Sequence, residues 1–88
     1  MPHYRIFLER RAQRQLEKLD EETKVRITEA LYVLGDIGFS ARLDIKKLRG
    51  YKDQYRLRVG KYRILFELQP GKIIIVYAIL PRRRAYRS

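Results

Sequence analysis

A ten-residue stretch, residues 55–64, constrains the fold of this chain most strongly. Its sequence is YRLRVGKYRI, in which Gly60-Lys61 separates two runs of alternating apolar and basic residues. A glycine at the first central position suits a type II′ hairpin turn, which requires a positive φ there. We therefore predict two antiparallel strands joined by a two-residue turn, and a turn of this length fixes which residues face one another.

The alternation of side chains along a strand assigns the two faces of this hairpin. One face is apolar and consists of Tyr55, Leu57, Val59, Tyr62, Ile64 and Phe66. The other face carries three arginines, Arg56, Arg58 and Arg63. The register pairs Arg58 with Arg63, and like charges directly opposite each other destabilise a sheet. This pattern is typical of an anion-binding patch; the alternative is the solvated outer face of an amphipathic sheet.

The N-terminal half predicts a strand followed by two helices. Residues 4–8 alternate as in a strand, and the spacing of Ala12, Leu16 and Leu19 predicts a helix over residues 10–19. Asp20 is the expected N-cap of a second helix. Gly35 or Gly38 is expected to end that helix.

The C-terminal half predicts mainly strands. Residues 45–50 form a short extended segment or turn, and the hairpin follows. Residues 73–80 are apolar and mostly β-branched, as expected of a strand buried on both faces. The order β-α-α-β-β-β favours an α+β fold, a small and mainly antiparallel sheet with two N-terminal helices on one face. The length of 88 residues suits one domain, residues 1–88.

The charge of the chain favours a nucleic-acid partner. It has 21 Lys and Arg against 10 Asp and Glu, a formal net charge of +11. Arginine matches phosphate with two parallel hydrogen bonds, and most of the basic residues here are arginines. A highly charged thermophile surface is the alternative. The chain has no cysteine, no apolar run long enough to span a membrane and no signal-peptide pattern, so we expect a cytoplasmic protein.

Most familiar catalytic signatures are missing from the sequence. His3 is the only histidine, no glycine-rich phosphate loop is present, and the acidic residues are scattered. We therefore expect no metal and no cofactor, and an enzyme built this way must rely on arginine electrostatics. Residues 82–88 form a basic tail in which Tyr86 stands among arginines, a combination suited to unpaired RNA. The alternative is a disordered basic terminus.

Taken together, these features resemble the RelE/ParE superfamily of bacterial and archaeal toxins. The resemblance covers nearly the whole chain: the opening strand and helix pair, the motif from Lys47 to Gly50, the hairpin, and the ending from Pro81 to Tyr86. It implies the same α+β fold and a toxin of a type II toxin–antitoxin system, neutralised by a RelB-like antitoxin protein.

Within this superfamily, the RelE-like branch cleaves messenger RNA on the ribosome, whereas the ParE branch inhibits DNA gyrase without RNase activity. The RelE pattern implies a catalytic set of four arginines and one tyrosine, matched here by Arg56, Arg58, Arg63, Arg82 and Tyr86. Nearby basic residues are expected to bind RNA: Lys52, Lys61, Arg83, Arg84 and Arg87. The complete set favours the RNase branch, with the ribosome and messenger RNA as partners.

Two departures from the RelE pattern concern proton transfer. Many relatives carry lysine in place of Arg56 and Arg58, and one such lysine can serve as general base; arginine is effectively never deprotonated in a protein. Many also carry histidine in place of Pro81. We therefore expect a metal-independent, ribosome-dependent endoribonuclease whose general acid and base are unassigned. The alternatives are a ParE-like gyrase inhibitor and a toxin-derived binding module that acts with its antitoxin.

Overall fold

The predicted hairpin is present in the structure, and its register is the predicted one. The structure is a computed structural model that describes residues 3–82. Strand β3 (Gln54–Val59) runs antiparallel to β4 (Tyr62–Gln69), with Val59 opposite Tyr62 and Arg58 opposite Arg63. Gly60 has a φ of 57°, the positive value that a type II′ turn requires at this position.

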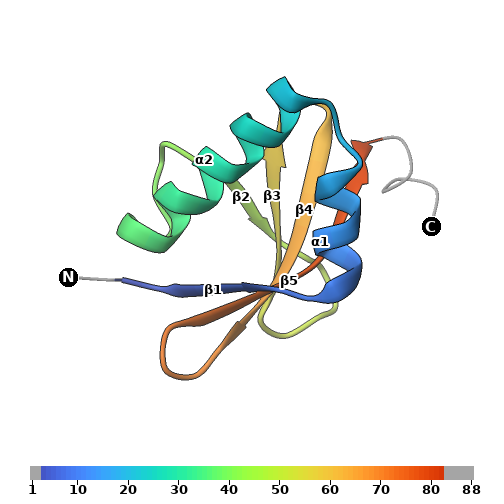
Figure 1. Cartoon of the computed structure of the whole chain (residues 1–88). Helices are drawn as coiled ribbons and strands as arrows, with labels where there is room; N and C mark the ends of the chain where they lie inside the picture. The colour runs from blue at the N-terminus through green and yellow to red at the C-terminus, as the bar shows by residue number, and fades with distance from the viewer. Residues whose placement is uncertain (1–2, 83–88) are drawn as a thin grey trace.

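Five strands form one mixed sheet in the order β1-β5-β4-β3-β2 (Figure 1). The edge strand β1 (Arg5–Leu8) is parallel to β5 (Ile73–Pro81), and the other neighbouring pairs are antiparallel. The opposite edge is β2 (Asp44–Lys47), a short strand where the sequence indicated an extended segment or turn. The predicted α+β class and element order are therefore confirmed, with β2 as an additional strand.

Both helices, α1 (Arg10–Glu17) and α2 (Glu21–Ile37), lie on one side of the sheet (Figure 1). Asp20 is the N-cap of α2, as predicted: its carboxylate accepts a 2.7 Å hydrogen bond from the Thr23 hydroxyl and a 3.1 Å bond from the Thr23 backbone N–H. These bonds lower the pKa of the Asp20 carboxyl. Among residues 3–82, neither helix has the length and apolar character needed to cross a membrane.

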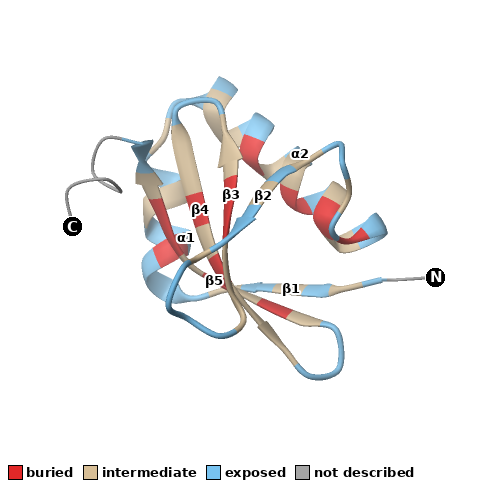
Figure 2. Ribbon diagram, turned by 180° about the vertical axis from the view of Figure 1, so that it is seen from behind, coloured by how far each residue is buried: buried red, intermediate tan, exposed pale blue. Residues whose placement is uncertain are grey.

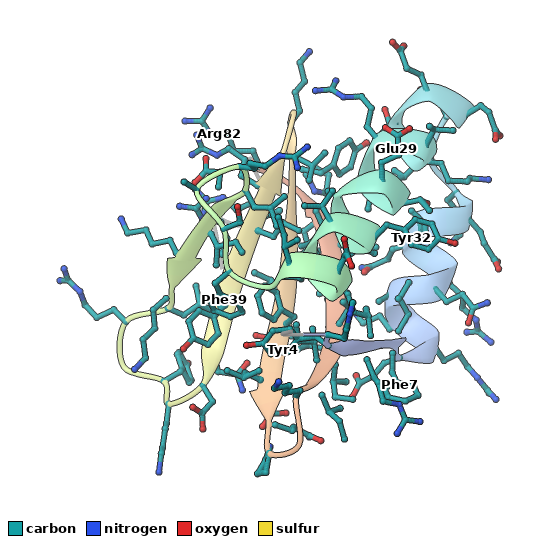
Figure 3. All side chains as sticks on the ribbon, turned by 90° about the vertical axis from the view of Figure 1, so that its left-hand side faces the viewer. Tyr4, Phe7, Glu29, Tyr32, Phe39 and Arg82 are labelled. Atoms are coloured by element: carbon teal, nitrogen blue, oxygen red, sulfur yellow. The ribbon has the colours of Figure 1, made fainter. Side chains whose placement is uncertain are left out.

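The core lies between the helices and the apolar face of the sheet. The largest fully buried side chains come from α2 and three strands: Phe66, Ile27, Leu34, Leu57, Ile64, Ile74 and Val76. Phe66 also stacks on Tyr55, with ring centroids 5.6 Å apart, and Phe39 meets both rings edge-on. Figure 3 shows Phe39 and Tyr4 beside the C-terminal end of α2, close to the sheet. The predicted apolar face of the hairpin is therefore its core face.

The prediction that residues 73–80 are buried on both faces is wrong for one face. Ile74 and Val76 are fully buried in the core, whereas Ile73 and Ile75 are only partly buried on the other face. A β-bulge then inserts Tyr77, because Phe66 pairs with Val76 and Leu65 with Ala78. No helix among the described residues covers this second face, which we call the open face (Figure 2).

Gly38 ends α2 in a conformation that other residues rarely adopt. Its φ is 74°, and a Cβ atom at this position would lie 2.7 Å from the Tyr4 ring. Gly50 has a similar φ of 83° but open space around it. We expect Gly38→Ala to lower the free energy of unfolding by about 3 kcal/mol, since backbone strain and the clash add, and Gly50→Ala by about 1 kcal/mol, from strain alone. Urea denaturation measures both; equal losses would contradict the role of the Tyr4 contact.

Candidate functional site

The open face contains a hollow whose walls are strongly basic. It has a volume of about 860 Å³ and is bordered by β2, the loop over residues 48–52, β3 and β4. Seven of the ten residues that line it are lysine or arginine, and none is acidic: Lys46, Lys47, Leu48, Arg49, Gly50, Tyr51, Lys52, Arg56, Arg58 and Arg63. We call this feature the basic hollow. Its charge and shape suit an anionic ligand.

The sheet register explains why the three hairpin arginines meet in the basic hollow. Arg58 and Arg63 are directly opposite each other, and Arg56 lies two residues before Arg58 on the same face. Strand β2 adds two more charges to this face, because Lys46 is opposite Arg56 and Asp44 is opposite Arg58. The predicted trio is therefore held on one surface by strands rather than by loops.

Arg56 is the most enclosed of these basic side chains. The residue is only 8% exposed, and its Nη1 donates a 3.1 Å hydrogen bond to Asp44 Oδ1 and a longer one, 3.4 Å, to the Asp44 carbonyl. A buried guanidinium group needs such a counter-charge, because taking it out of water unpaired is costly. Asp44 is itself 55% exposed at the side chain, so the pair lies at the border of the hollow rather than in the core.

Arg58 is less buried and keeps hydrogen-bonding capacity. Its side chain is 31% exposed, and its Nε lies 3.9 Å from Asp44 Oδ2, beyond hydrogen-bond distance. That Nε is buried and has no hydrogen-bond partner among the described residues. A buried donor without a partner is unfavourable until a ligand or water accepts from it. The side chain is therefore well placed to donate to an anion in the basic hollow.

The remaining predicted site residues are distributed differently. Lys52 lines the basic hollow, whereas Lys61 borders a separate depression beside the start of α2. The backbone N–H of Arg82 donates a 2.7 Å hydrogen bond to the Lys61 carbonyl, which fixes this exposed residue beside the hairpin turn. Figure 3 shows Arg82 at that end of the sheet, on the side away from the helices. Four predicted residues lie outside the described residues: Arg83, Arg84, Tyr86 and Arg87.

Sequence reasoning missed four charged residues of this region: Asp44, Lys46, Lys47 and Arg49. The available signal was the alternation around Ile45, whose apolar side chain packs against the core while its two neighbours are exposed. Three alternating residues are too few to identify a strand by themselves. They place Asp44 and Lys46 on the open face only when the pairing of β2 with β3, and the register of that pairing, are known. Tyr51 is also at the basic hollow, as a 65% exposed aromatic side chain beside Lys52.

The phenol of Tyr77, the bulged residue of β5, should make the stability of the protein depend on pH in the alkaline range. Burial raises the pKa of its phenol, and Glu67 and Tyr51 nearby raise it further. A pKa raised in the folded state means that stability is fully present below the unfolded tyrosine pKa of about 10 and is lost as the pH rises through the folded pKa. We expect urea unfolding between about pH 9 and 11 to show a smaller loss of stability for Tyr77→Phe than for the wild type. Tyr32→Phe, on α2, is the control; identical losses in all three proteins would contradict the assignment.

Comparison with known proteins gives concordant results. The sequence matches, over residues 6–86, the model of a family described as the ParE toxin of type II toxin–antitoxin system, parDE. It is also similar to Toxin RelE3 of Methanocaldococcus jannaschii, with 49% identity over 45 residues. That match covers 51% of this chain and 50% of the relative, so it spans only about half the length of either protein.

Two solved archaeal structures share the fold over nearly its whole extent. One is a RelB-RelE antitoxin-toxin complex from Methanococcus jannaschii, with a TM-score of 0.78 and 29% identity over 92% of this chain and 95% of the matched chain. The other is an archaeal RelE-RelB complex from Pyrococcus horikoshii, with a TM-score of 0.80 and 27% identity over 96% and 99% of the two chains.

Proposed function

Since this chain belongs to the RelE/ParE superfamily of type II toxin–antitoxin toxins, we propose that it acts as a member of the RelE-like branch, a ribosome-dependent endoribonuclease that cleaves messenger RNA. The observation that carries the proposal is the convergence of Arg56, Arg58 and Arg63 in the basic hollow. Three arginines on one rigid surface suit a phosphodiester group.

In the proposed reaction, the ribose 2′-hydroxyl oxygen attacks the adjacent phosphorus. A new bond from O2′ to phosphorus forms, the bond to the 5′ oxygen of the next nucleotide breaks, and a 2′,3′-cyclic phosphate and a 5′-hydroxyl result. The 2′-hydroxyl loses its proton, and the leaving oxygen gains one. Arg58 and Arg63 would hold the phosphate and stabilise the negative charge that grows on it, a contribution of about a hundredfold or more for a well-placed donor.

Arginine cannot supply the base, because it is effectively never deprotonated in a protein. The described residues that line the basic hollow include no histidine. We therefore propose that positioning and electrostatic stabilisation provide most of the rate, with the ribosome holding the messenger. Tyr86, which lies outside the described residues, is proposed to stack on a base or to assist proton transfer.

We propose a RelB-like antitoxin as the protein partner. Both archaeal structures that share this fold are complexes of RelE with RelB. The formal charge of +11 favours a partner with acidic segments, since complementary charge speeds association and selects partners. An acidic antitoxin that covers the basic hollow would also exclude RNA from it.

Gyrase inhibition, the activity of the ParE branch, is the competing function, because the matching family is described as a ParE toxin. A gyrase inhibitor would act through protein contacts and would leave RNA intact. A supercoiling assay with purified protein separates the two functions. Poisoned gyrase together with intact messenger RNA would overturn the RNase proposal.

The exposed Arg82 offers a test of the proposed site that leaves the core untouched. We expect Arg82→Ala to lower messenger RNA cleavage by about a hundredfold and to relieve growth arrest, because one donor to the phosphate is lost. The measurement is the mapping of messenger RNA ends after induced expression. Arg14→Ala, on α1 at the opposite face, is the control and should cleave like the wild type. Equal cleavage by the Arg82 variant and the wild type would show that Arg82 does not take part in the proposed reaction.

A further inference from the structure

We propose that Asp44 is a positioning residue of the basic hollow, whose carboxylate fixes the guanidinium groups of Arg56 and Arg58 before a phosphate group arrives. The proposal rests on the function proposed above, in which these arginines act on RNA. Asp44 stands directly opposite Arg58 on the neighbouring strand. Each of its two carboxylate oxygens faces a different arginine: Oδ1 lies 3.1 Å from Arg56 Nη1, and Oδ2 lies 3.9 Å from Arg58 Nε.

The contact leaves most of the arginine donors for a ligand. A guanidinium group has five N–H donors, and both hydrogen bonds from Arg56 to Asp44 use the same nitrogen, Nη1. Arginine side chains are otherwise flexible and lose entropy when a ligand orders them. A carboxylate that orders two of them in advance lowers the cost of organising the site at the moment of reaction.

The same carboxylate opposes the binding of RNA. Asp44 contacts Arg56 and Arg58 of the hollow, and its negative charge repels an incoming phosphate. A positioning role therefore predicts opposite changes when the charge is removed: tighter binding of RNA and slower cleavage. A purely structural role predicts that binding, cleavage and stability all decline together.

The experiment compares Asp44→Asn and Asp44→Glu with the wild type and with Asp36→Asn. Asp36 is an exposed aspartate on α2, on the other side of the sheet, so its replacement makes the same change in net charge away from the hollow. Affinity is measured with a 2′-O-methyl oligoribonucleotide, which cannot be cleaved. Cleavage is measured on messenger RNA in programmed ribosomes. The exchange rate of the Arg56 guanidinium protons, measured by NMR, reports the order of that side chain.

We expect Asp44→Asn to bind the oligoribonucleotide about fivefold more tightly, because a repulsive charge is lost. We expect it to cleave at least about tenfold more slowly, because the arginines are no longer fixed, and to exchange the Arg56 protons faster. Asp44→Glu should recover part of the cleavage rate, and Asp36→Asn should change neither quantity by more than about twofold, since distant exposed charges are screened.

Wild-type cleavage and unchanged Arg56 exchange in Asp44→Asn would overturn the proposal, and so would weaker binding that follows a loss of stability. A wild-type protein that cleaves no RNA would overturn the proposed function instead. In that case the affinity and the proton exchange still decide the role of Asp44: tighter binding with faster exchange supports it, and no change in either refutes it.

Discussion

Replacing Arg58 with glutamine is expected to slow messenger RNA cleavage by about a hundredfold while the fold stays intact. The Arg58 Nε is a buried donor without a partner among the described residues, so its replacement removes a group that is available to a phosphate. The change also relieves the repulsion from Arg63 directly opposite and removes the 3.9 Å contact with Asp44. These two effects oppose each other, so the free energy of unfolding should change by less than about 1 kcal/mol.

Cleavage by the Arg58→Gln variant is measured in single turnover on programmed ribosomes, and its stability by urea denaturation. Arg14→Gln removes the same chemical group from the exposed face of α1 and serves as the matched control. Cleavage by Arg58→Gln within a few-fold of the wild type would show that the phosphate does not contact this side chain. A large loss of stability would show that Arg58 supports the fold rather than the reaction.

Phe66→Ala is expected to have the largest effect on stability, a loss of about 4 kcal/mol in the free energy of unfolding. Phe66 is fully buried and contacts Tyr55 and Phe39 through its ring. A cavity of this size at the centre of a small core cannot be closed by its neighbours without strain. Since domains of this kind are stable by only about 5–15 kcal/mol, the variant should unfold at much lower urea concentration.

Phe7→Ala is the matched control for the loss of a phenylalanine ring. Phe7 is 44% exposed on the edge strand β1, where the Arg5 guanidinium lies 5.4 Å from the ring centroid. We expect this variant to lose less than about 1 kcal/mol, the cost of a surface substitution with a weak cation–π contact. Similar losses for the two variants would contradict the position of the core on the helix side of the sheet.

The hairpin was predictable from sequence because its determinants are local. Gly60-Lys61 fixes the turn, the turn fixes the register, and the alternation then assigns Leu57 and Ile64 to the core face. The start of α2 was predictable for the same reason, since the Asp20 cap acts within one helical turn. Features that depend on neighbours along the chain are accessible to this kind of reasoning.

The rest of the candidate site depends on contacts between distant segments. Asp44 and Lys46 reach the open face because β2 pairs with β3, and the short sequence of β2 does not specify that pairing. The bulge at Tyr77 likewise results from how β5 fits against β4. Sequence therefore located three arginines and Lys52 of the basic hollow, but the carboxylate between two of the arginines, and Lys46 and Lys47 beside them, required the assembled sheet.

The most direct test of the account is the mapping of messenger RNA ends during induced expression of the wild-type chain and of Arg58→Gln, with gyrase supercoiling assayed on the same purified proteins. The account predicts new 5′-hydroxyl ends within translated messages for the wild type, about a hundredfold fewer for the variant, and unaffected gyrase for both. Intact messenger RNA together with inhibited gyrase in the wild type would contradict it.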